Sequence, residues 1–341
     1  MDDPALDSPE GLDLDALATV LDRRCPGLRR GPLRGELIFG GMSNLTYRVR
    51  DGESDWVVRR PPLGHVLETA HDMSREFRVL QCLHATIVPV ARPVLLENDP
   101  QALGSPFYVM DYVPGRAMRA SADLVALGPE RTRRLCEDMV DLLAAIHSVD
   151  PESVGLGDFG RPEGFLERQV RRWTKQLDAS RSRDIPSLDA LAADLAAHIP
   201  QSGDVSIVHG DYRLDNLLVD ESGAIVAVVD WEMATLGDPL ADVGLLVVYQ
   251  RLSGQGILVG DVTTAPGYPP EEELLARYAV TSGRNLAHLG FYIGLASFKL
   301  AVIAEGIHYR YTLGQTRGTG FERVGAMVGP LADAGRAALA G

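Results

Sequence analysis

The sequence has very little lysine. Only two of its 33 basic residues are lysines, Lys175 and Lys299, and the remainder are arginines. Both lysines lie in the second half of the chain, which excludes any mechanism that needs a lysine in the first half. Acidic residues outnumber basic ones by 47 to 33, and the resulting net charge of -14 disfavours nucleic acid or an anionic membrane as a partner.

Cysteines and targeting signals are also scarce. The three cysteines are far apart and show no CxxC spacing, which favours a reducing compartment. The first ten residues are acidic and lack the basic and apolar regions of a secretory signal. The longest apolar stretch, residues 290–303, is interrupted by Ser297 and Lys299 and is shorter than the roughly 20 residues that span a bilayer. We therefore expect a cytoplasmic enzyme without a membrane partner.

The first third of the chain is rich in strand signals. An amphipathic helix with Leu14 and Leu17 on one face opens it, and a second helical segment covers residues 70–83. Five segments have the composition of strands, at residues 36–39, 46–50, 56–59, 93–96 and 106–112. Asp51-Gly52 is a hairpin signal between two of them. This pattern predicts a small sheet with one inserted helix.

Helical spacing predominates after Pro114-Gly115. The predicted helices cover residues 129–148, 164–179, 188–198 and most of 238–341, where Asp238 before Pro239 has the pattern of a helix start. Three short apolar segments interrupt them, at residues 205–208, 216–219 and 225–229. The sequence therefore predicts an α+β fold with a β-rich lobe at residues 1–112, a mainly helical lobe at residues 113–341, and a boundary near 111–116.

The most informative segment is H-G-D-Y-R-L-D-N at residues 209–216, followed by an apolar strand that ends in Asp230, 14 residues after Asn216. It matches H-x-D-x-x-x-x-N, the spacing of kinase catalytic loops. A carboxylate at Asp211 can accept the proton of a substrate hydroxyl, while Asn216 and Asp230 offer hard oxygen ligands to Mg²⁺. The alternative is a polar turn between two strands, which the full spacing and the flanking apolar residues disfavour.

The sequence resembles the aminoglycoside phosphotransferase and choline kinase family, and within it the subfamily related to domains fused to acyl-CoA dehydrogenases. Besides the HGD loop, the motifs that carry this resemblance are GGMSN at 40–44, RRPP at 59–62, MSREF at 73–77, DWE at 230–232 and GDP at 237–239. The resemblance covers roughly residues 30–330 and implies a protein-kinase-like, two-lobed fold. It also implies that Asp211 is the catalytic base and that Asn216 and Asp230 are metal ligands.

Three further residues near this loop are expected to support it. His209 is expected to brace the loop, and Asp215 is expected to order it by capping backbone N–H groups. Glu232 has two interpretations, because it could contact a second metal ion or orient Trp231.

The first lobe is expected to hold the nucleotide. The glycine-containing segment with Gly41, Ser43 and Asn44 lies between two predicted strands, where backbone N–H groups can approach phosphates, although an ordinary hairpin has the same signature. Kinases place a phosphate-binding lysine at the end of V-A-I-K, and here Arg59 occupies that place, with Glu76 as its helix partner. Strand alternation turns Arg60 to the opposite face.

The adenine of ATP or GTP is expected to contact main-chain groups at the end of the strand that leads into the hinge. Asp111 and Val113 supply these groups, and Met110 lines the back of the site. A methionine in an apolar strand is also typical of plain core.

The acceptor is less constrained than the donor. Lys299, His308 and Arg310 on the late apolar helix are candidate acceptor-binding residues, and Lys299 could equally be a lysine whose aliphatic stem covers the core. The resemblance favours a small hydroxylated molecule, such as a hydroxyacyl-CoA. Two alternatives stay open, a catalytically silent nucleotide-binding pseudokinase and an aminoglycoside-type antibiotic kinase. A protein kinase is less favoured, because no A-P-E segment or activation loop is present.

Overall fold

The structure is a computed structural model that describes residues 8–39, 44–63, 72–201, 203–255, 260–315 and 320–341. The chain forms two compact units. The first contains residues 1–115 and 226–232, and the second contains residues 116–225 and 233–341. Segment 226–232 therefore belongs to the first unit, although the division predicted from the sequence placed it in the second.

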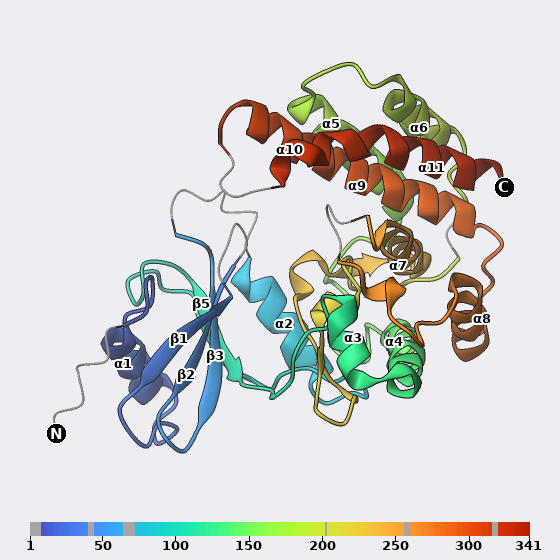
Figure 1. Ribbon diagram of the computed structural model, residues 1–341. Coiled ribbons are helices and arrows are strands. Elements are labelled where there is room, and N and C mark those ends of the chain that lie inside the picture. The colour runs from blue at the N-terminus through green and yellow to red at the C-terminus, as the bar shows by residue number, and fades with distance from the viewer. Residues whose placement is uncertain (1–7, 40–43, 64–71, 202, 256–259, 316–319) are drawn as a thin grey trace. The chain divides into compact units, whose positions relative to one another are not determined.

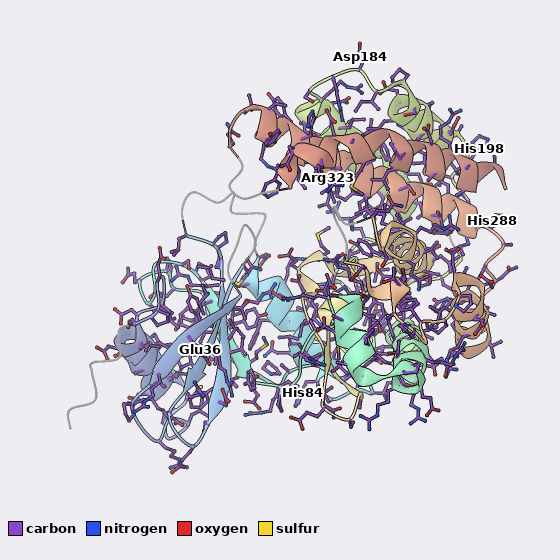
Figure 2. The ribbon with its side chains drawn as sticks, viewed as in Figure 1. Glu36, His84, Asp184, His198, His288 and Arg323 are labelled. Carbon is purple, nitrogen blue, oxygen red and sulfur yellow. The ribbon has the colours of Figure 1, made fainter. Side chains whose placement is uncertain are left out.

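The first unit is built on a five-stranded antiparallel sheet with the strand order β1-β2-β3-β5-β4. The strands are β1 (Arg34–Phe39), β2 (Leu45–Arg50), β3 (Asp55–Arg60), β4 (Pro93–Glu97) and β5 (Phe107–Asp111) (Figure 1). All five were predicted from the sequence. At the β2–β3 turn the Asp51 carboxylate accepts the N–H groups of Glu53 and Ser54, and Gly52 has a φ of 96°, a backbone conformation that favours glycine. Glu36 on the outer strand β1 (Figure 2) pairs with Arg50 of β2 at 3.3 Å, while Leu37 and Ile38 of the same strand are exposed.

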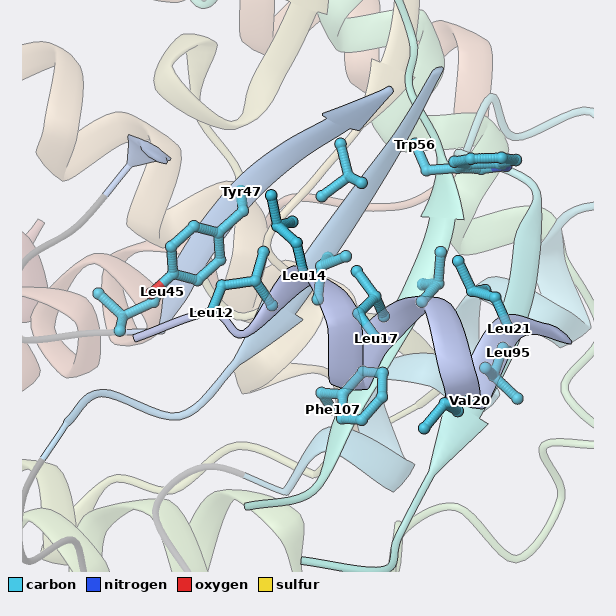
Figure 3. Close-up of a cluster of buried hydrophobic side chains, with 13 residues drawn as sticks. Leu12, Leu14, Leu17, Val20, Leu21, Leu45, Tyr47, Trp56, Leu95 and Phe107 are labelled. Atoms are coloured by element: carbon cyan, nitrogen blue, oxygen red, sulfur yellow. The ribbon is translucent and has the colours of Figure 1, made fainter. Parts of the chain in front are cut away.

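Two helices pack on this sheet. Leu14, Leu17 and Val20 of α1 (Leu14–Arg24) pack against Tyr47 and Trp56 and form a fully apolar cluster on one face of the sheet (Figure 3). The second helix, α2 (Met73–Leu83), begins at the N-cap Asp72, whose carboxylate accepts the N–H groups of Ser74 and Arg75. The ring of Phe77 on α2 lies 5.8 Å from that of Tyr108 on β5. Because side chains alternate along β3, Trp56 and Val58 join the α1 cluster, whereas Arg59 faces α2.

The second unit is mainly helical. Its α-helices are α3 (Ser121–Leu127), α4 (Pro129–Ser148), α5 (Phe165–Ser180), α6 (Pro186–Ala197), α7 (Leu240–Leu252), α8 (Glu271–Ser282), α9 (Leu289–Thr312), α10 (Phe321–Val324) and α11 (Val328–Ala340) (Figure 1). Helix α3, which lies just after the predicted hinge, was not predicted from the sequence. The helical prediction for residues 238–341 is confirmed for α7 to α11, with α7 starting at Leu240 after Asp238 accepts the N–H of that residue.

Short strands flank the HGD segment. β6 (Ser206–Val208) pairs antiparallel with β9 (Thr235–Gly237), and the 3-10 helix η1 (Leu214–Asn216) leads into β7 (Leu217–Val219). A turn closed by the Asp220 side chain connects β7 to β8 (Ile225–Val228), after which the 3-10 helix η2 (Trp231–Met233) begins. The end of β8 is fixed in the first unit, because the Val228 N–H donates to the Pro89 carbonyl at 2.8 Å.

The helix α9 is longer than the apolar stretch that the sequence analysis considered too short for a membrane. By length and composition it could cross a bilayer, and 78% of its most apolar 18-residue window is buried inside the protein. In the second unit α5, α6, α7 and α11 all pack against it. It therefore has the surroundings of a central core helix, whose burial rather than lipid explains its composition.

Candidate functional site

The HGD segment is a tight loop that begins directly after β6. Gly210 has a φ of 82°, and a Cβ atom at this position would lie 2.7 Å from the Met233 carbonyl oxygen. Glycine is required here for two reasons, because an L side chain is strained at this φ and would also collide with backbone. The side chain of His209 is fully buried, and its Nδ1 accepts the N–H of Asp211 at 3.2 Å. The side chain of His209 thus contacts the loop backbone, and its predicted bracing role stays a prediction.

The buried carboxylate of Asp242 on α7 holds the loop. It accepts the N–H groups of His209 and Gly210, each at 2.7 Å, and lies 3.3 Å from Nε2 of His147. Burial opposes a charge at this position, but His147 and the loop N–H groups outweigh it and lower the pKa of Asp242. The Nδ1 of His147 is bonded in turn to the hydroxyl of Tyr278 at 2.7 Å. The loop therefore rests on a buried polar network.

The carboxylate of Asp211 is held at both oxygens. The hydroxyl of Tyr249 donates to its Oδ1, and Nδ2 of Asn216 donates to its Oδ2 at 3.0 Å. Nδ2 of Asn216 also donates to the Asp211 carbonyl at 2.8 Å. Because both bonds use the amide nitrogen, the amide oxygen of Asn216 is the atom that can ligate a cation. The structure thus brings Asp211 and Asn216 into direct contact, while their roles as base and metal ligand stay predictions.

Asp215 does not have the predicted contacts. Its carboxylate lies 3.3 Å from NH2 of Arg213, and burial raises its pKa against the opposing effect of that guanidinium. The carboxylate that binds backbone N–H groups of the loop, those of His209 and Gly210, is that of Asp242. The reason is geometric, since Asp242 approaches the loop from a packed helix, whereas Asp215 lies within the 3-10 turn.

Lys299 contacts the same loop from α9. Its Nζ donates to the Gly210 carbonyl at 2.7 Å and lies 5.8 Å from the centre of the Trp173 ring. Burial lowers the pKa of Lys299, and the nearby Asp211 and Asp242 counteract this effect. His308 lies instead where Gly325 approaches α9, and Arg310 is exposed. Eleven residues of helix place Arg310 about 16 Å from Lys299 along the axis. Of the three candidate acceptor-binding residues, only Lys299 reaches the loop.

Arg59 is the centre of a second cluster, in the first unit. Its Nε lies 3.0 Å from Oε2 of Glu76, and its NH2 lies 2.5 Å from Oδ1 of Asp230. The side chains of Arg59 and Glu76 are only 11% and 3% exposed. Burial opposes the charge of Arg59, but the two carboxylates outweigh it and raise its pKa. The predicted Arg59–Glu76 ion pair is therefore present.

The opposite orientation of Arg60 also agrees with the predicted strand alternation. Its guanidinium donates to the Gly11 carbonyl on the α1 side of the sheet.

Burial also raises the pKa of Glu76, and Arg59 counteracts this effect. An arginine is the appropriate cation for such a position, because it keeps its charge even when largely buried.

Asp230 adopts a strained backbone conformation. Its φ is 67°. Among the residues that the structure describes, it is the only non-glycine residue with a left-handed backbone conformation. Such strain is typical of functional positions, where surrounding contacts hold it. Here the Arg59 guanidinium holds the carboxylate, and the neighbouring Trp231 indole donates to the Val228 carbonyl at 3.1 Å.

The next residue, Glu232, contacts the glycine-containing segment. Its Oε2 accepts from Nδ2 of Asn44 at 3.3 Å. Asn44 is 1% exposed, and its Oδ1 has no hydrogen-bond partner among the described residues. Gly41 and Ser43, which were also predicted to bind phosphate, lie outside the described residues. The structure thus adds a contact that neither interpretation of Glu232 included.

Fewer main-chain groups are available to bind adenine than the sequence predicted. The N–H of Asp111 donates to the Arg92 carbonyl at 2.9 Å, and that of Tyr112 donates to the Asp55 carbonyl at 3.0 Å. The Asp111 carboxylate pairs with Arg92. The N–H groups of Asp111 and Tyr112 are therefore already bonded within the protein. A main-chain N–H bond to adenine stays a prediction for Val113. Met110 is 9% exposed on β5, on the face of the sheet that Arg59 occupies.

Two contributors to the loop were not assigned by sequence reasoning. Neither Asp242 nor Tyr249 was assigned a role at the loop from the sequence. A signal was available, because the two residues are seven positions apart in an apolar segment and therefore share one face of a helix. Which loop that face contacts depends on tertiary packing, which local spacing does not encode.

The chain is similar to known proteins over most of its length. The model of the "Phosphotransferase enzyme family" matches residues 35–279, more than half of the chain. Acyl-CoA dehydrogenase family member 11 of Gallus gallus is 34% identical over 336 residues, which are 95% of this chain and 43% of the relative. The chain thus spans less than half the length of this relative.

Solved structures share the fold. A Ralstonia eutropha structure provisionally described as an aminoglycoside phosphotransferase is 34% identical with a TM-score of 0.84, and the match covers 96% of this chain and 98% of that one. A thermostable mutant of aminoglycoside phosphotransferase APH(4)-Ia, solved as a ternary complex with AMP-PNP and hygromycin B, has a TM-score of 0.61 at 16% identity, covering 96% and 99%. The protein-kinase-like fold predicted from the sequence is confirmed.

Proposed function

The chain belongs to the phosphotransferase enzyme family, and from this premise we propose that it transfers the γ-phosphoryl group of ATP or GTP to a hydroxyl group of a small molecule. The observation that carries the proposal is Asp211, a carboxylate on a braced loop with both oxygens held in place. A carboxylate fixed in this way can orient a hydroxyl group and accept its proton during phosphoryl transfer.

The residues present fit a magnesium–nucleotide complex. Asn216 and Asp230 supply amide and carboxylate oxygens, which are the donors that Mg²⁺ prefers. Mg²⁺ usually keeps water and substrate phosphates among its ligands, so such a site does not need a cluster of three or more His, Cys, Asp or Glu side chains, of which the described residues contain none. When bound, the ion would neutralise phosphate charge. The convergence of Asn216 and Asp230 on one ion stays a prediction.

In the proposed reaction the acceptor oxygen attacks the γ-phosphorus, and the bond to the bridging oxygen of the nucleoside diphosphate breaks. Asp211 accepts the proton that the acceptor hydroxyl loses. Arg59 contributes a largely buried positive charge for phosphate oxygens, and Glu76 fixes its guanidinium at 3.0 Å. A nucleotide co-substrate is supported by the AMP-PNP bound in the APH(4)-Ia structure of the same fold.

For the acceptor we propose a polyanionic hydroxylated molecule, such as a hydroxyacyl-CoA. The exposed face of α5 carries Arg171, Arg172 and Lys175, and within the described part of the chain none of them has an ion-pair partner. Three unpaired cations on one helix are notable in a chain with a net charge of -14. A polycationic aminoglycoside would be repelled here.

These cations are linked to the catalytic loop through aromatic and polar contacts. The Arg172 guanidinium lies 5.3 Å from the centre of the Trp173 ring, which Lys299 also approaches while binding the Gly210 carbonyl. An anionic group bound along α5 would therefore lie in the same unit as Asp211 and on the side of the loop that Lys299 contacts.

A nucleotide-consumption screen tests the activity. The panel contains hydroxyacyl-CoAs, amino alcohols, sugars and aminoglycosides, and mass spectrometry identifies a phosphorylated product. We expect Mg²⁺-dependent turnover that Asp211→Ala abolishes while nucleotide binding survives. Binding without turnover across the panel would instead support the pseudokinase, for which the arginine at position 59 in place of lysine is the best argument.

A pair of double variants tests the acceptor class. We expect Arg171→Ala/Arg172→Ala to raise KM for the polyanionic acceptor at least tenfold and to leave KM for ATP unchanged. Arg131→Ala/Arg134→Ala removes the same charge from the exposed face of α4 and is the matched control. Equal effects of the two double variants, or efficient turnover of aminoglycosides, would contradict the proposed acceptor class.

A further inference from the structure

The α7 helix contacts the catalytic loop at two levels. Asp242 and Tyr249 are seven residues apart, or about two helical turns, and project from the same face. Asp242 binds backbone N–H groups of the loop, whereas Tyr249 reaches one residue further and bonds the side chain of Asp211. One helix thus fixes both the backbone of the loop and the carboxylate that the loop presents.

The phenol of Tyr249 is a permanent donor in this position. Burial and the adjacent Asp211 carboxylate raise its pKa well above the ordinary value, so the hydroxyl keeps its proton. Arg213 limits the motion of the ring, since its guanidinium lies 4.8 Å from the ring centre and its Nε lies 3.8 Å from Oδ2 of Asp211. Because the Tyr249 hydroxyl keeps its proton, it acts as the donor in its hydrogen bond with Oδ1 of Asp211.

The two oxygens of Asp211 therefore have different donors. Oδ1 is bonded to Tyr249 and Oδ2 to Asn216, and each oxygen retains a further lone pair. If the Tyr249 bond were absent, the carboxylate could rotate about its Cα–Cβ and Cβ–Cγ bonds, with Asn216 as its single short side-chain partner. A carboxylate that rotates orients an acceptor hydroxyl less well, and misplacement of a reacting group by about 1 Å can cost a hundredfold in rate.

We propose that Tyr249 is a positioning residue for phosphoryl transfer, which fixes the orientation of the Asp211 carboxylate toward the acceptor hydroxyl. This inference rests on the proposed function. It adds a residue outside the H-x-D-x-x-x-x-N motif, located 38 positions after Asp211 and supplied by a different helix. Tyr249 does not contact the reacting atoms in this proposal and acts through Asp211.

The chain provides a matched control for removal of the hydroxyl group. Tyr268 lines the same small cavity as Tyr249, together with Arg213 and Gln250. Its hydroxyl accepts from Nε2 of Gln250 at 3.2 Å and has no bond to Asp211. Tyr268→Phe and Tyr249→Phe therefore each remove one hydroxyl group from a tyrosine that lines this cavity. Only Tyr249→Phe also removes a contact with the proposed base.

The test compares these variants with the unmodified protein, using the acceptor that the screen identifies. We expect Tyr249→Phe to lower kcat tenfold to a hundredfold with KM for ATP within twofold of the original value, and Tyr268→Phe to leave kcat within twofold. Incorporation of 3-fluorotyrosine at position 249 retains the hydroxyl and is expected to retain kcat. A Tyr249→Phe protein with unchanged kcat, or one whose kcat and KM change in parallel with those of Tyr268→Phe, would overturn the inference.

A spectroscopic arm keeps the inference falsifiable if Tyr249→Phe fails to fold. The ¹⁹F resonance of 3-fluorotyrosine at position 249 is expected to shift on Asp211→Asn, whereas the resonance of the same label at position 268 is expected to stay in place. An unchanged resonance at position 249 would overturn the inference by itself. Absence of turnover in the unmodified protein would overturn both the proposed function and this inference. Turnover in the unmodified protein with an unchanged kcat in Tyr249→Phe would overturn this inference alone.

Discussion

The carboxylate of Asp242 accepts the backbone N–H of Gly210 at 2.7 Å, one residue before the proposed base Asp211. Asp242 is fully buried and also binds the N–H of His209. The position of the loop backbone is thus set by a side chain 32 residues away in the sequence. This contact explains how a loop that contains a glycine with positive φ can still hold a carboxylate in a defined place.

Replacement of Asp242 by asparagine is expected to destabilise the protein. The amide retains one acceptor oxygen, but its NH2 group would face backbone donors, and loss of a buried bond to a charged acceptor costs about 2–3 kcal/mol. Urea unfolding measures the change. Asp189→Asn, which removes one partner of the surface pair with Arg181, is the control and is expected to cost less than about 1 kcal/mol. Similar losses in both variants would argue against the role of Asp242.

The Arg59–Glu76 pair is expected to show strong coupling. Arg59→Ala leaves the Glu76 carboxylate buried and without its cation, which costs about 3–5 kcal/mol, and Glu76→Gln removes the unpaired charge. The double variant is therefore expected to be less destabilised than the sum of the two single variants. A double-mutant cycle by urea unfolding measures this difference, and additive effects would show that the ion pair contributes nothing.

The same Arg59→Ala protein tests the phosphate-binding role. We expect a higher KM for ATP and a lower kcat, because the proposed cation for the phosphates is lost. Arg50→Ala removes an arginine of the exposed pair with Glu36 on the same sheet and is expected to change neither constant. Unchanged KM and kcat in a folded Arg59→Ala protein would refute the assignment.

Gly210→Ala is expected to reduce activity by a hundredfold or more. The added methyl group would lie 2.7 Å from the Met233 carbonyl oxygen in addition to being strained at a φ of 82°. Gly283→Ala isolates the second effect, since Gly283 has a φ of 68° but no atom within 4 Å of the added Cβ. We expect Gly283→Ala to cost about 1 kcal/mol in stability with kcat preserved. An active Gly210→Ala enzyme would contradict the fixed loop geometry.

His147 is expected to make stability depend on pH. Burial lowers its pKa in the folded state below the ordinary value of about 6.5, so the unfolded state binds the proton first. The stability is therefore fully present above about pH 6.5 and is lost as the pH falls through that value toward the lower, folded pKa. Between pH 7.5 and 5.5 we expect unfolding free energy to fall more steeply for the unmodified protein than for His147→Gln.

The exposed His198 provides the comparison for this measurement. His198→Gln, at the end of α6, is expected to keep the slope of the unmodified protein. The largest difference that one histidine can produce is about 1.4 kcal/mol per pH unit. Equal slopes for His147→Gln and the unmodified protein would show that the buried histidine is not the source of the pH dependence.

The features that local sequence predicted best are those fixed by periodicity. Arg59 and Arg60 are adjacent, and strand alternation predicted their opposite faces, while the kinase V-A-I-K pattern predicted that Arg59 is the partner of Glu76. The H-x-D-x-x-x-x-N spacing likewise identified Asp211 and Asn216 as parts of one site, and the structure shows a direct hydrogen bond between them that was not predicted. The helix at Pro129–Ser148 was predicted with its observed bounds, since proline at its first position marks the start.

The features that escaped prediction depend on packing between distant elements. Asp242, Tyr249 and Lys299 reach the loop from α7 and α9, and no local pattern states which loop a helix face will contact. The same reason explains why capping of the loop was predicted for Asp215, whereas Asp242 binds the His209 and Gly210 N–H groups. At Asp111 and Tyr112, the expected nucleotide contacts compete with main-chain hydrogen bonds that became visible only once β5 was placed.

The scarcity of lysine gives the catalytic loop a chemical reporter. The chain offers only two lysine side chains to an amine-selective reagent. Lys175 is exposed, whereas the ammonium group of Lys299 is bound to the Gly210 carbonyl. Modification at position 175 records the reactivity of a free surface amine in the same molecule. The rate of modification at position 299, normalised to that value, measures how often the Lys299 amine leaves the Gly210 carbonyl, and it does so without any substrate.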